Sequence, residues 1–332
     1  MGPGGARVMP SYLQAVNQVI ASASAQIPNL VLYGENINTG SHICGMTRNL
    51  KTPPGGRLIN VGNCELTHCG VGFGLMMAGV SSILFVKQLD FIVLGIDHFI
   101  STYNVVRAHR DPARLGSFTI CVIVCDQGWQ GPQSSFNALG DLCSLARVPG
   151  YALTNASDAA RIVPAQLRAP GFRLIALSQR LFPTEALAPE VLADDGAGAV
   201  LQYSPGEDAT IVCANFSFPH GWMLHQRLRE QGMSAGVFGV NYVHPAPWQR
   251  ILESVARTGR LIVLDDSKSV HLLGHSLLAD VARQCPGARA RLISREAEID
   301  PGVCADQLAV EYEELASWVA SGQPEPVAEA GR

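Results

Sequence analysis

The sequence predicts an α/β protein of two domains, each a mainly parallel sheet flanked by helices. Short β-branched apolar runs alternate with segments of helical length along most of the 332 residues. Hydrophobic residues make up 47% of the chain, which is enough to fill two cores. A stretch rich in Pro, Gly, Ala and acidic residues interrupts the pattern after Arg180, and it indicates the end of one domain.

The interruption sets the expected boundaries. We expect a first domain over residues 1–183, a connector over 184–207 and a second domain over 208–322. The polar, Pro-containing residues 323–332 are expected to be a disordered tail. The expected strands are the apolar runs at 29–37, 57–62, 81–86, 117–124, 173–177, 209–215, 236–240, 260–266 and 290–294.

Composition excludes several classes of partner. A net charge of −4 with 16% charged residues gives no basic surface for nucleic acid or an anionic membrane. No apolar run reaches the roughly 18 residues that span a bilayer, and the N-terminal residues lack a signal-peptide pattern, so a cytoplasmic protein is expected. The nine cysteines are expected to be reduced packing residues, and none has the spacing of a metal site.

Three acidic residues stand beside apolar segments. Glu65 lies between an apolar strand and a glycine-dense apolar helix, Glu35 ends the first strand, and Asp97 follows Phe91 in an apolar segment. Neighbouring buried carboxylates have perturbed proton affinities that proton-transfer chemistry uses. The structural alternative is three separate helix caps and surface acids. For the glycines at 70–74, close helix packing explains the spacing better than a phosphate cradle.

These residues carry a resemblance to a known family. GEN at 34–36, RLINVGNCE at 57–65, the glycine-spaced run at 71–79 and DF at 90–91 resemble the β subunits of the E1 components of 2-oxo acid dehydrogenases. NVGNCE with the glycines also resembles the pyrimidine-binding domain of transketolases, and residues 206–267 resemble the closing domain of the family. The resemblance covers residues 28–285 and implies a thiamine diphosphate enzyme.

The resemblance assigns roles to individual residues. Glu65 matches the glutamate that hydrogen-bonds N1′ of the cofactor's aminopyrimidine and relays a proton to it. Phe91 matches the aromatic side chain that stacks on the same ring, with a core phenylalanine as the alternative. Glu35 and Asp97 match acids of a proton path between paired active sites.

The loop after the fourth strand departs from the family pattern. Family members carry a histidine there, whereas this chain has only neutral polar candidates for contacting substrate: Gln133, Ser134, Ser135 and Asn137. Such groups form hydrogen bonds but do not deliver a proton near neutral pH. His42, in the loop after the first strand, is the better substitute. His68, one helical turn after Glu65, is a second candidate, with a helix-surface hydrogen bond as the alternative.

A second departure concerns the metal. The family binds magnesium through a GDG motif and an Asn about two dozen residues later, and this sequence has no such pair. The magnesium ligands are therefore expected on an α-type partner that carries GDG and the spaced Asn, in an α₂β₂ assembly with thiamine diphosphate at the interface.

The resemblance implies carbon–carbon bond cleavage in a ketose or 2-oxo acid, with transfer of a two-carbon unit to an aldehyde or to a lipoyl or carrier-protein thiol. The NVG before Glu65 favours transketolase-type transfer over an ordinary 2-oxo acid dehydrogenase E1 β subunit, and the missing histidine points the same way. A non-catalytic scaffold subunit is the alternative from another class. An unrelated doubly wound binding protein is a further alternative.

Overall fold

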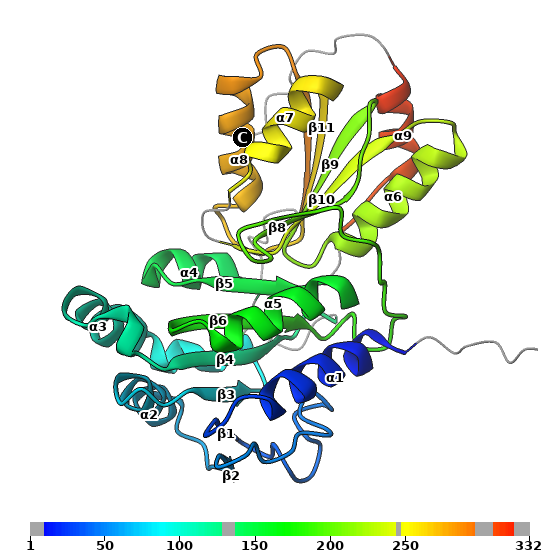
Figure 1. Cartoon of the computed structure of the whole chain (residues 1–332). Helices are drawn as coiled ribbons and strands as arrows, with labels where there is room; N and C mark the ends of the chain where they lie inside the picture. The colour runs from blue at the N-terminus through cyan, green and yellow to red at the C-terminus, as the bar shows by residue number, and fades with distance from the viewer. Residues whose placement is uncertain (1–9, 128–136, 244–246, 296–307, 322–332) are drawn as a thin grey trace, which may run out of the picture.

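The computed structural model describes residues 10–127, 137–243, 247–295 and 308–321. They form two domains, each built on a six-stranded sheet with helices on its faces (Figure 1). The expected fold class is therefore confirmed. The expected tail at 323–332 lies outside the described residues.

The first domain contains a wholly parallel sheet in the order β2-β1-β3-β4-β6-β5. Its elements are α1 (Tyr12–Ala25), β1 (Val31–Gly34), β2 (Arg57–Asn60), α2 (Glu65–Met77), β3 (Ser82–Val86), η1 (Leu89–Gly95), η2 (His98–Thr102), α3 (Tyr103–His109), η3 (Pro112–Arg114), β4 (Ser117–Val124), α4 (Leu139–Ala146), β5 (Gly150–Leu153), α5 (Ala156–Arg168) and β6 (Gly171–Ser178).

The second domain contains a mixed sheet in the order β12-β11-β9-β10-β8-β7, in which β8 and β7 are antiparallel to their neighbours. Its elements are β7 (Ala193–Asp195), β8 (Val200–Ser204), β9 (Ala209–Ala214), α6 (Phe218–Glu230), β10 (Ala235–Val240), α7 (Gln249–Thr258), β11 (Arg260–Asp265), α8 (Leu273–Gln284), β12 (Arg289–Ser294) and α9 (Tyr312–Ala320).

Residues 193–204 differ from the expectation for this region. The segment 184–207 was expected to be a connector, but it contains β7 and β8, which pair with the second sheet. Two of its three glycines, Gly196 and Gly198, lie in the turn between these strands and adopt positive φ. The second sheet therefore begins before residue 208. The Pro- and Gly-rich composition of the segment reflects short strands and a tight turn rather than a connector.

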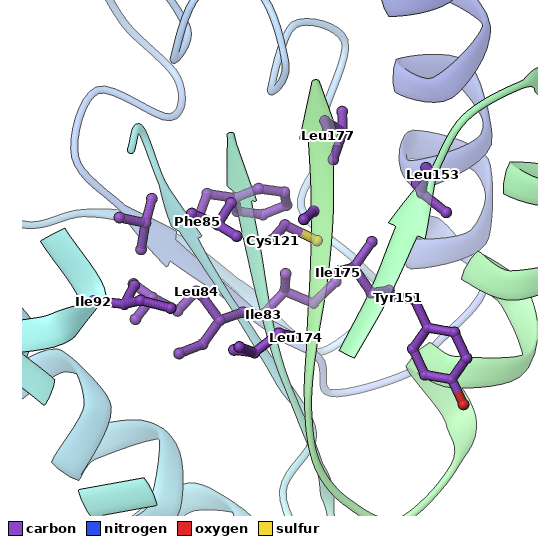
Figure 2. Close-up of a cluster of buried hydrophobic side chains, with 14 of the residues drawn as sticks. Ile83, Leu84, Phe85, Ile92, Cys121, Tyr151, Leu153, Leu174, Ile175 and Leu177 are labelled. Carbon is purple, nitrogen blue, oxygen red and sulfur yellow. The ribbon is translucent and has the colours of Figure 1, made fainter. Parts of the chain in front are cut away.

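The strands β3, β4 and β6 of the first sheet are buried on both faces, as in α/β folds with helices on each side. Figure 2 shows apolar side chains from β3, β4, β5 and β6 lying across the sheet. On one side, α2 packs closely because Gly72 faces the Phe118 ring, where a Cβ would overlap the ring. Gly72 thus serves helix packing, as expected, whereas a Cβ on Gly74 would meet nothing within 4 Å.

Polar contacts join the two domains. Asn241, which follows β10, donates from Nδ2 to Asp158 Oδ2 at 2.8 Å and to the Ala152 carbonyl at 2.7 Å. The Ala152 amide donates to the Asn241 carbonyl at 2.9 Å, and Tyr151 and Tyr242 form an antiparallel bridge. Residues 241–243 therefore pair with β5, at the edge of the first sheet.

The loop after β4 is tied to the same junction. Asp126 accepts hydrogen bonds from Ser178 Oγ at 2.6 Å and from the Arg180 amide at 2.9 Å. Arg180 pairs with Asp266 of the second domain at 2.6 Å. At the far end of the loop, Asn137 donates to the Asp266 carbonyl at 2.9 Å. Asp126 and Asn137, near the two described ends of this loop, are thus held by one cluster of contacts around Arg180 and Asp266.

Among the described residues, no single helix is long and apolar enough to cross a membrane. One bent pair, Leu89–Gly95 with His98–His109, meets the criteria of length and composition.

Candidate functional site

The candidate site lies at the carboxyl ends of β2, β1 and β3, three neighbouring strands. Glu35 directly follows β1, Glu65 is the first residue of α2 after β2, and Phe91 lies in η1 after β3. Because the strands are parallel and adjacent, their carboxyl ends meet at one edge of the sheet. Three segments that lie far apart in the sequence are brought together there.

A single pocket contains these side chains. It is lined by Glu35, Asn36, Ser41, Ile43, Glu65, His68, Leu84, Phe85, Val86, Lys87 and Phe91. Leu84 and Phe85, which Figure 2 labels on β3, belong to its apolar floor. The pocket combines two carboxylates and an imidazole with apolar and aromatic surface, which is typical of a site that holds a small organic group.

Glu65 lies in the first turn of α2. The preceding residue, Cys64, is the N-cap and makes no side-chain hydrogen bond to the helix backbone. The unpaired N–H groups of a helix N-terminus stabilise a nearby negative charge. Glu65 is thus inside the helix and beside the pocket, rather than being the N-cap itself.

Glu35 is the second carboxylate of the pocket. Burial raises the pKa of Glu35, and the negative charge of Glu65 raises it further. With its amide nitrogen turned toward Glu35, Asn63 donates to Oε2 at 2.7 Å. Glu35 therefore takes up a proton more readily than an ordinary glutamate, and its proton affinity depends on the charge of Glu65.

His68 lies on the same side of α2 as Glu65 and lines the pocket. Burial lowers the pKa of His68, while Glu65 acts in the opposite direction. The Tyr33 hydroxyl donates to the His68 carbonyl at 2.9 Å, and the two rings meet edge to face. A predominantly neutral imidazole in this position can accept or donate a proton.

Three of the residues expected in the site lie elsewhere. His42 has its Nδ1 3.4 Å from the Ile37 carbonyl and does not line the pocket, although its neighbour Ser41 does. Asp97 is exposed and accepts a hydrogen bond from Ser101 Oγ at 2.8 Å. Asn137 is buried at the domain junction. Gln133, Ser134 and Ser135 lie outside the described residues.

Three polar residues of the pocket were not among the expected site residues: Asn36, Ser41 and Lys87. Ser41 belongs to the loop after β1, and its position depends on the path of that loop. Lys87 directly follows β3 and lines the pocket that contains Glu35 and Glu65. Its place directly after a buried strand, beside the strand that Glu35 follows, was the available signal.

No protein-family model matches the chain. Several relatives with similar sequences are β subunits of an oxidoreductase or a dehydrogenase. The acetoin:2,6-dichlorophenolindophenol oxidoreductase subunit β of Cupriavidus necator is 22% identical over 293 residues, covering 82% of this chain and 84% of the relative. The 2-oxoisovalerate dehydrogenase subunit β of Bacillus subtilis is 23% identical over 285 residues, covering 83% and 85%.

A third relative is the mitochondrial pyruvate dehydrogenase E1 component subunit β-1 of Arabidopsis thaliana, 24% identical over 284 residues and covering 81% of this chain and 76% of the relative. Among solved structures, an inactive β4 tetramer of a split-gene transketolase has a similar fold, with a TM-score of 0.66, 15% identity and coverage of 94% and 97%. The resemblance to 2-oxo acid dehydrogenase β subunits is confirmed in sequence, and the transketolase-like fold is confirmed over both domains.

Proposed function

We propose that this chain is the β-type subunit of a two-subunit thiamine diphosphate enzyme that cleaves a carbon–carbon bond of a ketose or 2-oxo acid and transfers a two-carbon unit. The observation that carries the proposal is the single pocket that joins Glu65, Glu35 and His68 with Phe91. The E1-type relatives favour a 2-oxo acid dehydrogenase component as the second candidate.

The pocket residues fit an aminopyrimidine. Phe91 and the end of β3 offer flat apolar surface, and Glu65 offers a carboxylate oxygen at the edge of the same space. An aminopyrimidine ring has apolar faces and ring nitrogens at its edge, so it needs this combination. When bound, the cofactor supplies a carbanion that attacks the substrate carbonyl.

In this proposal, residues of this chain bind and release the proton. Glu65 forms a hydrogen bond to the ring nitrogen at the pocket edge and holds or releases one proton there. The pKa of Glu35 depends on the charge of Glu65, because that charge contributes to raising it. A proton taken up by Glu65 therefore lowers the proton affinity of Glu35. Asp97 in a longer proton path, and His42 near the substrate, stay predictions.

The proposed α-type partner covers an apolar surface beside the pocket. Six of the eleven large hydrophobic residues exposed in the described chain lie on α2, η1 and α3, so exposure is concentrated there. They are Leu66, Val71, Met77, Val93, Leu94 and Val105. α2 also begins at Glu65. A chain docked on this surface closes the pocket and brings the magnesium and diphosphate ligands beside it.

The experiment uses calorimetry of thiamine diphosphate and Mg²⁺ binding to this chain alone and to its mixture with a partner carrying GDG and a spaced Asn. We expect tight binding only in the mixture. Glu65→Gln should still assemble but should lose turnover of a ketose or 2-oxo acid by about 100-fold or more. Glu253→Gln, on the exposed side of α7, is the control and should turn over normally.

Two outcomes contradict the proposal. If neither preparation binds the cofactor, the chain is a scaffold subunit. If the mixture is active and Glu65→Gln matches the wild type, the chain belongs to an enzyme but Glu65 is not catalytic. Comparing ketose and 2-oxo acid substrates, each with an aldehyde or a lipoyl acceptor, distinguishes the two candidate reactions.

A further inference from the structure

A second cleft, of about 520 Å³, lies between the two domains and shares no lining residue with the pocket of Glu35 and Glu65. One wall is α4 of the first domain, and the other is formed by segments that follow β9, β10 and β11 of the second. The walls approach closely, since a Cβ on Gly140 would lie 3.8 Å from Ser269 Oγ. The volume is within the range of small-molecule sites, about 300–1,000 Å³.

The cleft occupies the position where open α/β sheets bind ligands. β9 lies between β11 and β10, so the chain leaves the sheet in opposite directions around β9. The three strands are parallel, and the cleft is lined by residues that follow their carboxyl ends. Such a switch point produces a crevice outside the strand ends, which is the common site of ligands in these folds.

Asn215 is a buried polar residue in the lining of this cleft. It is 4% exposed and lines the cleft directly after β9. Its Nδ2 donates to Asp265 Oδ1 at 2.7 Å, which fixes the orientation of the amide. Among the described residues, no donor reaches its Oδ1. A buried carbonyl oxygen without a donor is unfavourable, so this oxygen is suited to accept a hydrogen bond from a ligand.

Serine hydroxyls surround the amide. Ser267 and Ser269 lie in the loop after β11 and are linked by an Oγ–Oγ hydrogen bond of 2.9 Å. Ser144 of α4 and Ser276 of α8 are exposed on opposite walls. A hydroxyl donates one hydrogen bond and accepts others, so these serines suit a ligand that itself carries several hydroxyl groups.

The charges of the cleft disfavour an anion. The described lining residues include no Lys or Arg, whereas Asp141 lines the cleft and Asp265 lies beneath Asn215. A phosphate or carboxylate ligand would meet the Asp141 side chain, and the buried Asp265 would lie behind Asn215. A metal ion is also disfavoured, because the described chain holds no group of three His, Cys, Asp or Glu side chains suited to bind one.

We infer that the interdomain cleft binds a small neutral polyhydroxylated molecule, a sugar or polyol, whose hydroxyl groups donate to Asn215 and Asp141 and exchange hydrogen bonds with the serines. The ligand touches both domains, so its binding stabilises their contact. This site is independent of the thiamine diphosphate proposal, because its residues belong to neither the pyrimidine pocket nor the apolar surface of α2.

The test is saturation-transfer NMR of the full chain with D-ribose, D-glucose and ribitol, and with inorganic phosphate as competitor. We expect at least one polyol to bind with a dissociation constant on the order of 1 mM. The double variant Ser144→Ala/Ser276→Ala should weaken binding roughly fivefold or more, because two exposed hydrogen-bonding groups are lost. Ser317→Ala, an exposed helical serine of α9, is the matched control and should bind normally.

Asn215→Gly probes the buried carbonyl, since glycine accepts the positive φ of 55° at this position. Its fold is checked by circular dichroism, and the serine variant carries the test if this one does not fold. Glu65→Gln should bind the polyol as the wild type does. The inference is overturned if no polyol binds, if binding is unchanged in the serine variant, or if phosphate displaces the polyol.

Discussion

The carboxylates of the domain junction and those of the pyrimidine pocket differ in what surrounds them. Asp126, Asp158 and Asp266 are completely buried, and donors from both domains contact them. Glu35 and Glu65 are partly exposed, and Asn63 is the donor seen at Glu35. Raised pKa values occur in both regions, so a raised pKa alone does not identify a functional acid. The number of surrounding donors separates acids that hold the fold from acids that are free to exchange protons.

The largest effect is expected from breaking the junction ion pair. Arg180→Met leaves Asp126 and Asp266 buried without their cation, and it should lower the free energy of unfolding by about 3–5 kcal/mol. Urea denaturation monitored by circular dichroism measures the change. Arg227→Met removes an exposed pair with Glu230 and should cost about 1 kcal/mol at most. Equal losses in the two variants would show that the junction pair contributes little.

A second prediction uses the pH dependence of Asp158. Burial raises its pKa to about 6, although Thr154 and Asn241 donate to it. Since an unfolded aspartate has a pKa of about 3.9, the folded state binds the proton more tightly. This contribution to stability is fully present below pH 4 and is lost as the pH rises through about 6.

The measurement is the free energy of unfolding of wild type and Asp158→Asn between pH 4 and 7. The stability of the wild type relative to the variant should fall over this range, by on the order of 2 kcal/mol. Glu190→Gln, an exposed acid, should follow the wild type. A parallel pair of curves for wild type and Asp158→Asn would mean that the proton affinity of Asp158 is the same in folded and unfolded chains.

The smallest effects concern the helix that carries Glu65. Gly72→Ala places a Cβ against the Phe118 ring and should cost about 1–3 kcal/mol by overpacking. Gly74→Ala, two residues away, has open space around its Cβ and should stabilise the helix by about 0.5–1 kcal/mol. Thermal denaturation distinguishes the two. Opposite signs at Gly72 and Gly74 would confirm that the glycine pattern serves packing on one face, while equal signs would contradict it.

Most of the fold was predictable from apolar runs, because buried parallel strands such as β4 and β9 are almost continuous in Val, Ile and Cys. β7 and β8 were missed, and β5 was not among the strands expected from apolar runs. Each is five residues or fewer, and β7 and β8 lie in a segment whose glycines resemble a linker. Their identity as strands depends on partners distant in sequence, which periodicity does not show.

The part of the site that could be predicted consists of residues whose location follows from their position after a strand. Glu35, Glu65 and Phe91 each follow a strand, so parallel topology alone brings them to one edge. His42 and Asn137 were candidates because of their residue type, but the direction of a loop side chain depends on tertiary contacts. His42 faces the Ile37 carbonyl, and Asn137 bonds to the Asp266 backbone.

The pairing of residues 241–243 with β5 has a consequence for association between molecules. An edge strand with unpaired backbone groups is a template for strand addition and aggregation. The second domain covers the β5 edge, whereas β2, at the other edge of the same sheet, is short and mostly exposed and carries Arg57. If the domains separated, the buried apolar β5 would become a free edge. The first domain produced by itself is therefore expected to aggregate through this strand. In the full chain, the second domain prevents such association by covering the β5 edge.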